Sequence, residues 1–137
     1  MEYHLKNRKI KKGDSVMFDI DDTLIDASTD NIIPWSLQLL NYAKKLGYKI
    51  ILITARPYSI VNHKATLQQL KSHKIKFDIL LYASHDKKTN VKKKLIKDGF
   101  HFVLSVGDLW TDLSDSDHWV KLPEFTTSIV SRSSNRK

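Results

Sequence analysis

The sequence predicts an α/β protein in which a mostly parallel sheet of about five strands lies between two layers of helices. Two observations predict this fold class. Short runs that are apolar throughout alternate along the chain with segments whose apolar residues recur at helical spacing, and such strands are typical of a parallel sheet buried on both faces. The length of 137 residues is that of one domain with a single core.

The first half of the chain contains two predicted strands and one predicted helix. Residues 15–20 form a short apolar run with an aspartate near its end, and the run has the length of a buried strand. Residues 25–32 are polar and are expected to form turns. A helix is predicted from about Ile33 until Gly47, because apolar residues are three or four apart and glycine is common just after a helix. Residues 49–54 (KIILIT) are the second strand.

The second half continues the alternation. Pro57 is expected to open a helix with one apolar face, which consists of Ile60, Leu67 and Leu70. Residues 77–82 are the third strand, and residues 88–97 form a helix that a glycine ends. The fourth strand is predicted at 102–106 and a short fifth strand at 118–122.

The folded domain is predicted at residues 14–127, after a basic leader (1–13) and before a basic tail (128–137) that is expected to be disordered. No apolar run is long enough for a membrane span, and the leader lacks the apolar segment of a signal peptide. The chain has no cysteine, which excludes disulfides and thiolate sites. These features predict an intracellular, cytoplasmic protein.

Acidic residues are concentrated in two segments of an otherwise basic chain. The formal net charge is +8, from 23 Lys and Arg against 15 Asp and Glu. The first acidic segment contains Asp19, Asp21, Asp22, Asp26 and Asp30, and the second contains Asp108, Asp112, Asp115 and Asp117. Carboxylates this close repel one another unless a cation lies among them. The segments therefore predict a bound cation, and the basic remainder predicts a surface that attracts acidic partners.

Polar side chains follow the predicted strands where each strand ends. Asp19 and Asp21 follow the first strand, Thr54 and Arg56 the second, Lys87 and Lys88 the third, and Asp108 and Asp112 the fourth. In an open parallel sheet, ligands bind beyond the carboxyl ends of the strands. Carboxylates suit a hard cation such as Mg²⁺, whereas a threonine hydroxyl and a lysine suit phosphoryl oxygens. This edge is therefore expected to bind Mg²⁺ and a phosphoryl group.

The sequence resembles the haloacid dehalogenase (HAD) superfamily of phosphatases over about residues 14–125. FDIDDTL is similar to the first motif of that superfamily, Asp-x-Asp-x-Thr, LIT to its second and GDLWTD to its fourth. The segments TARP, KTNVKKKL and VKLPEF resemble the acid phosphatase-like subgroup (subfamily IIIB-like), although Lys92 stands where an arginine is usual. The resemblance implies a Rossmann-like, three-layer α/β/α fold, and the short spacing between the motifs leaves no room for a cap domain.

The resemblance also implies a Mg²⁺-dependent phosphomonoester hydrolase that works through an aspartyl-phosphate. Asp19 would attack phosphorus, and Asp21 would act first as general acid and then as general base. Thr54 and Lys88 would hold the transferring phosphoryl group. The ligands of Mg²⁺ would be the carboxylates of Asp19 and Asp108, the backbone carbonyl of Asp21 and, directly or through water, Asp112.

Neighbouring residues have less specific expected roles. Thr23, Arg56 and Lys87 are candidate substrate-binding residues. Thr23 is also expected to bond to the backbone of its loop, and a surface salt bridge is an equal alternative for Arg56. Lys88 is favoured over Lys87 as the phosphate ligand because it precedes Thr89 at the predicted helix start. The alternative is that both lysines belong to a solvated basic face.

Without a cap, the site would be open apart from a small flap at residues 24–31, and would admit bulky phosphates or borrow a lid from a second copy of the chain. The basic surface favours nucleotides or nucleic-acid phosphates as substrates. The alternative function is a catalytically silent basic module that binds nucleic acid or protein. A calcium loop is disfavoured because Leu24 stands where that loop needs glycine, and a receiver domain is disfavoured because Asp19 and Asp21 share one loop.

Overall fold

The computed structural model describes residues 2–123, so the expected tail at 128–137 lies outside the described residues. Its centre is a five-stranded sheet with the order β5-β4-β1-β6-β7, in which every neighbouring pair is parallel. The strands are β1 (Asp14–Phe18), β4 (Lys49–Thr54), β5 (Ile79–Tyr82), β6 (His101–Gly107) and β7 (His118–Lys121). The predicted α/β class with a mostly parallel sheet is confirmed.

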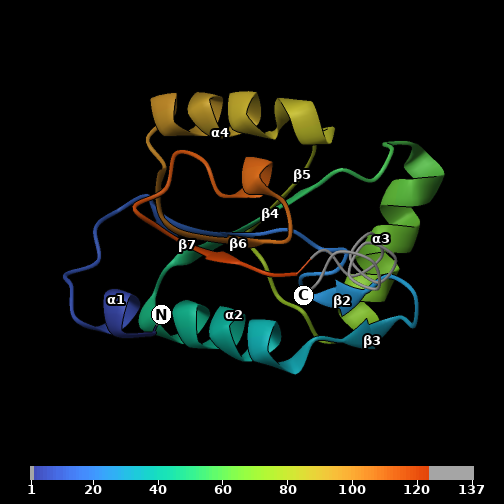
Figure 1. Ribbon diagram of the computed structural model, residues 1–137, viewed down its shortest axis with the longest axis horizontal. Helices are drawn as coiled ribbons and strands as arrows, with labels where there is room; N and C mark the ends of the chain where they lie inside the picture. Colours follow the sequence, from blue (N-terminus) through green and yellow to red (C-terminus); the bar gives the residue numbers. More distant parts are fainter. Residues whose placement is uncertain (1, 124–137) are drawn as a thin grey trace, which may run out of the picture.

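Helices cover both faces of the sheet (Figure 1). On one face lies α4 (Lys88–Lys97), and on the other pack α1 (Glu2–Lys6), α2 (Pro34–Leu46) and α3 (Ile60–Ser72). Side chains alternate along the central strand, so that Val16 and Phe18 join the core with α2, whereas Met17 joins the core with α4. This period of two, with apolar residues on both faces, makes the expected three-layer sandwich.

The order of the strands decides where polar groups meet. Because β1 pairs with β4 on one side and with β6 on the other, the segments that follow these three strands share the middle of one sheet edge. Two short 3-10 helices lie at the same edge. They are η1 (His85–Lys87), which follows β5, and η2 (Trp110–Asp112), which follows β6.

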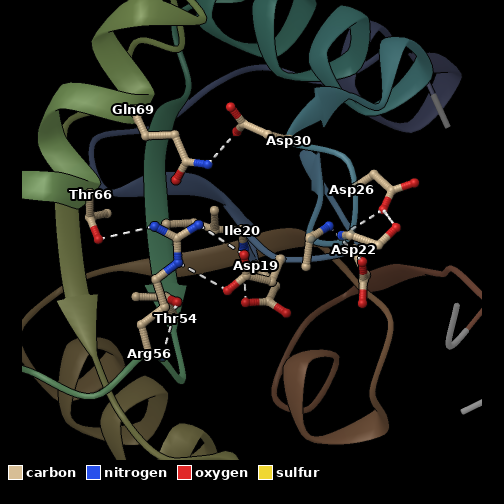
Figure 2. Close-up of polar contacts among 12 residues, drawn as sticks. Asp19, Ile20, Asp22, Asp26, Asp30, Thr54, Arg56, Thr66 and Gln69 are labelled. Atoms are coloured by element: carbon tan, nitrogen blue, oxygen red, sulfur yellow. Dashed lines mark hydrogen bonds and ion pairs between the residues drawn. The ribbon is translucent and has the colours of Figure 1, made fainter. Parts of the chain in front are cut away.

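The flap predicted at residues 24–31 contains a small hairpin. Its two strands are β2 (Ile25–Asp26) and β3 (Asn31–Ile32), which pair antiparallel. Leu24 is fully buried, so the base of this segment belongs to the core. The tip is held by α3 and the residue that caps it: Gln69 Nε2 on α3 donates to Asp30 Oδ1 (2.6 Å; Figure 2), and Nε2 of the C-cap residue His73 lies 3.2 Å from the same oxygen.

Two expectations for the second helix are wrong. α3 begins at Ile60 rather than at Pro57, because Ser59 is its N-cap and the Ser59 hydroxyl accepts a backbone N–H of the first turn. Of the predicted apolar face, Leu70 is buried, whereas Ile60 is 68% exposed and Leu67 is 38% exposed. The start of α3 therefore presents apolar side chains to solvent.

The segment expected as a basic leader packs against the domain in its described part. Leu5 on α1 is fully buried in the core, and Tyr48 Oη donates to the Leu5 carbonyl (2.7 Å). Arg8 pairs with Asp14 at the start of β1 (2.8 Å). Within residues 2–123, no insertion has the size of a cap domain, and no helix is long and apolar enough to cross a membrane.

Candidate active site

Asp19 is fixed where β1 ends. Its backbone N–H donates to the Val106 carbonyl on β6 (3.1 Å), and its Oδ1 accepts the backbone N–H of Ile20 (2.8 Å). Asp19 is 4% exposed. The chain then turns away, because Asp22 has a φ of 59°, a left-handed conformation that aspartate tolerates better than most residues. Asp19 is thus held at the edge where sheets of this kind bind ligands.

Asp108 and Asp112 reach the same place from the end of β6. The chain reverses through η2, and the Leu109 N–H donates to Asp112 Oδ2 (3.1 Å). Glycine is needed at 107, because a Cβ on Gly107 would stand 2.4 Å from both Cβ and Oδ2 of Asp112. Carboxylate oxygens of Asp19, Asp108 and Asp112 lie within 4.8 Å of one another. The two acidic segments of the sequence therefore meet in one cluster.

Lys88 begins α4 and reaches this cluster. Its Nζ lies 2.6 Å from Asp112 Oδ1 and 3.1 Å from Asp19 Oδ1, and the lysine is fully buried. Burial alone would lower the pKa of Lys88, but the two carboxylates more than offset this effect, so its pKa is raised. Lys87, in contrast, is exposed on η1. Of the two candidate lysines, Lys88 is the one that contacts the carboxylates.

Three carboxylates and one lysine leave this cluster with excess negative charge. Burial raises the pKa of Asp19 well above its usual range, the charges of Asp112 and Asp108 add to the rise, and Lys88 opposes it. Burial also raises the pKa of Asp108. Negative groups held this closely away from water need a positive partner. Because the three carboxylates offer converging oxygens, the donor set fits a hard divalent cation such as Mg²⁺.

Arg56 holds Asp21 beside the cluster. Its Nε and Nη2 donate to the two carboxylate oxygens of Asp21 (3.0 and 2.8 Å), and its Nη1 donates to Thr66 Oγ1 on α3 (3.0 Å). Figure 2 shows the guanidinium between α3 and the loop that carries Asp19. Thr54 ends β4, is fully buried, and accepts the backbone N–H of Arg56 on its Oγ1 (3.2 Å). The bidentate pairing with the Arg56 guanidinium fixes the orientation of the Asp21 carboxylate.

Lys92 is a buried residue beside the cluster, and the sequence placed it in a motif but predicted no role for it in the site. It lies one turn after Lys88 on α4, and its Nζ donates to the Asp112 carbonyl (2.8 Å), to Ser105 Oγ (3.0 Å) and to Ser116 Oγ (3.2 Å). Burial lowers the pKa of Lys92 to about 8. Lys92 therefore holds the backbone of Asp112 in place through a hydrogen bond to its carbonyl oxygen. The signal that could have found it is its spacing of four from Lys88, which places both lysines on one helix face.

The loop after Asp19 differs in part from the expectation. Thr23 is fully buried, and its Oγ1 has no hydrogen-bond partner among the described residues, so the expected bond to the loop backbone is not formed. Asp22 instead ties the loop together, because its Oδ1 accepts the backbone N–H of Ala27 (3.0 Å). The turn is thus shaped by a carboxylate rather than by the neighbouring hydroxyl.

The family comparison agrees with this geometry. Residues 25–129 match the family model described as HAD superfamily, subfamily IIIB (acid phosphatase). The matched segment is most of the chain, and the protein belongs to this phosphatase family of the HAD superfamily. The matched segment includes Thr54, Lys88 and Asp108, and it begins after Asp19 and Asp21. No curated protein shows significant sequence similarity to the chain.

Two solved structures share the fold. A chain in the structure of the Pnkp1/Rnl/Hen1 complex has a TM-score of 0.60 and 22% identity, and one in the structure of the Pnkp1/Rnl/Hen1 RNA repair complex has a TM-score of 0.59 and 20% identity. The matches cover 87% and 86% of this chain, but 50% and 46% of those chains. The protein thus spans about half the length of these structural neighbours.

Proposed function

We propose that the protein is a Mg²⁺-dependent phosphomonoester hydrolase that forms an aspartyl-phosphate on Asp19, with residues 14–127 as the catalytic domain. The observation that supports this most strongly is the meeting of Asp19, Asp108, Asp112 and Lys88 at one sheet edge, from β1, from the end of β6 and from the start of α4. A surplus of carboxylates around a buried lysine suits a site that takes up a cation together with a phosphoryl group.

The proposed reaction has two steps. First, a carboxylate oxygen of Asp19 forms a bond to phosphorus while the ester P–O bond breaks, and Asp21 gives its proton to the leaving alcohol oxygen. Second, water attacks phosphorus, Asp21 takes the proton of that water, and the bond between Asp19 and phosphorus breaks to release phosphate. Both Asp21 oxygens accept from Arg56 in the structure, and because a neighbouring cation opposes protonation of a carboxylate, loosening of this pair would favour the step in which Asp21 acts as an acid.

The remaining residues would bind and neutralise charge. Thr54 and Lys88 would contact the oxygens of the transferring phosphoryl group. Asp19, Asp108, the Asp21 carbonyl and Asp112, the last directly or through water, would hold Mg²⁺, which when bound would offset the negative charge of the carboxylates and of the phosphate. Lys92 would keep Asp112 in place.

Basic charge supports nucleotides or nucleic-acid phosphates as the substrate class. The chain carries a net charge of +8, although its active-site edge is acidic, so the positive surface is available to the rest of a polyanionic substrate. The absence of a cap within residues 2–123 also supports a substrate larger than a metabolite. A second copy of the chain could supply the missing lid.

The direct test is hydrolysis of p-nitrophenyl phosphate with Mg²⁺ by the wild type, Asp19→Asn and Asp26→Asn. We expect Asp19→Asn to lower kcat by at least about 1,000-fold because the nucleophile is lost. Asp26→Asn is the matched control, because Asp26 lies in the same acidic segment but its carboxylate accepts from residues of the hairpin turn such as Ser28. Equal rates for the wild type and Asp19→Asn would refute the assignment of the nucleophile.

A second measurement tests the intermediate. Asp21→Asn is expected to accumulate phosphorylated Asp19, because p-nitrophenolate leaves without help from an acid, whereas the second step then lacks its base. Mass spectrometry of acid-quenched samples would locate the phosphoryl group on the peptide that contains Asp19. Tight binding of nucleic acid or protein without any turnover would instead favour the silent binding module.

A further inference from the structure

Three aromatic rings form a cluster at the end of β5. The Tyr58 and Tyr82 rings meet edge to face with centroids 5.1 Å apart, and the His63 ring lies 5.6 Å from Tyr82 and 5.9 Å from Tyr58. His63 Nδ1 also lies 3.0 Å from the Tyr82 hydroxyl. Edge-to-face packing of this kind stabilises aromatic pairs. The cluster, which we call the Tyr58 cluster, is therefore a preformed aromatic surface.

The Tyr58 cluster lies at the edge that carries the proposed chemistry. Tyr82 pairs in register with Thr54 on the neighbouring strand β4, and Tyr58 follows Arg56 by two residues. β4 in turn neighbours β1, which leads to Asp19. Two strand spacings amount to about 10 Å. A group bound on the cluster would thus be close enough to be part of the same substrate molecule as the phosphate at Asp19.

Apolar groups beside the cluster are turned to solvent. Tyr58 is 63% exposed, and Ile60 and Val61 at the start of α3 are 68% and 75% exposed. The loop that carries Tyr58 is nevertheless held in shape, because Asn62 donates its backbone N–H to Ser59 Oγ (3.0 Å) and its Nδ2 to the Pro57 carbonyl (2.9 Å). An ordered loop that keeps a tyrosine in solvent next to an active site suits contact with a ligand.

We propose that the Tyr58 cluster is a stacking subsite for a nucleobase, and that the substrate is the phosphorylated end of a single-stranded nucleic acid. The proposal rests on the phosphatase function proposed above. Aromatic side chains beside positive charge are the means by which proteins bind single strands, since every base offers a flat face. Positive charge is present on both flanking elements, where Lys64 on α3 and Lys87 on η1 are exposed, and the chain as a whole is at +8.

The test compares two substrates that differ in one base. Oligothymidylates with a terminal phosphate, on the 3′ or the 5′ end, carry either an intact or an abasic terminal nucleotide. For the wild type, we expect kcat/KM to favour the intact end by about 5- to 160-fold, the range for one base stacked on an aromatic ring. Tyr58→Ala should lose this preference, and Tyr58→Phe should keep it because the ring remains.

Trp119→Ala is the matched control. Trp119 is an aromatic residue of similar exposure, at 51%, but it lies on β7 at the opposite edge of the sheet, so its removal should leave the preference intact. A preference that Tyr58→Ala does not alter, or that the wild type lacks, would overturn the proposal. A loss of self-association in Tyr58→Ala, without a change in preference, would show that a second copy covers this surface instead.

A binding measurement separates this proposal from the proposed function. Fluorescence anisotropy of the same labelled oligonucleotides with Asp19→Asn, alone and combined with Tyr58→Ala, needs no turnover. Weaker binding of the intact end in the double variant, by the same factor, would support the stacking subsite even if no phosphatase activity were found. Equal binding by both proteins would refute the subsite even if the wild type hydrolyses every substrate.

Discussion

Replacement of Lys88 by methionine tests the charge balance of the cluster. Lys88→Met keeps the unbranched shape and most of the length of the side chain but removes the cation that lies 2.6 Å from Asp112 and 3.1 Å from Asp19. Loss of one member of a buried ion pair costs about 3–5 kcal/mol. Because this lysine serves two buried carboxylates, we expect the free energy of unfolding to fall by an amount near the upper end, about 4–5 kcal/mol, without Mg²⁺.

The deficit of Lys88→Met should depend on pH with a defined sign. The pKa values of Asp19 and Asp108 are raised in the folded protein, so these carboxyls bind protons at a higher pH when folded than when unfolded. The ionised carboxylates therefore lower the free energy of unfolding most at a pH above their folded-state pKa. This loss is relieved as the pH falls toward their pKa in the unfolded chain. The deficit is expected to be smaller at pH 5 than at pH 8.

Urea unfolding with a chelator present, at pH 5 and pH 8, measures this effect. Lys87→Met is the matched control, because Lys87 is the adjacent lysine and is exposed; a change within about 0.5 kcal/mol is expected there. Equal stability of the two variants at pH 8, or a deficit that grows on acidification, would contradict the interpretation that the cluster carries excess negative charge.

Two further predictions concern the proposed metal site. Mg²⁺ at 100 times its dissociation constant should stabilise the wild type by about 2.7 kcal/mol, seen as a higher thermal midpoint, whereas Asp108→Asn should lose most of this gain; an equal gain in both would exclude Asp108 as a ligand. Gly107→Ala should cost about 1–3 kcal/mol in urea unfolding and weaken the response to Mg²⁺, because the new Cβ would displace Asp112; an unchanged response would show that Asp112 is not needed for the ion.

The sequence predicted those parts of the molecule that depend on local pattern. Buried parallel strands are apolar throughout, so all five could be found, and their order in the chain limits what can meet at one edge. For the same reason Asp19, Asp108 and Lys88 could be placed together in advance, since each follows a strand. Thr54 could be placed at the end of its strand by the same argument.

Features that depend on tertiary contacts were not predictable in the same way. Lys92 belongs to a run of lysines that resembles a solvated face, and its burial follows from the position of α4 over Ser105 and Asp112. The pairing of Arg56 with Asp21 depends on how close the loop after β4 lies to the loop after β1, and no local pattern specifies this distance. The apolar spacing at the start of α3 was misleading, because Ile60 lies beyond the part of the helix that covers the sheet.

α3 makes a mechanical connection between two parts of the active-site edge. Gln69 and His73 hold the hairpin through Asp30, and Thr66, one turn earlier, holds Arg56 and through it Asp21. The hairpin and, through Arg56, the Asp21 carboxylate are therefore anchored to one helix at positions a single turn apart. A shift of α3 would consequently alter the contacts of the hairpin and of Asp21 together.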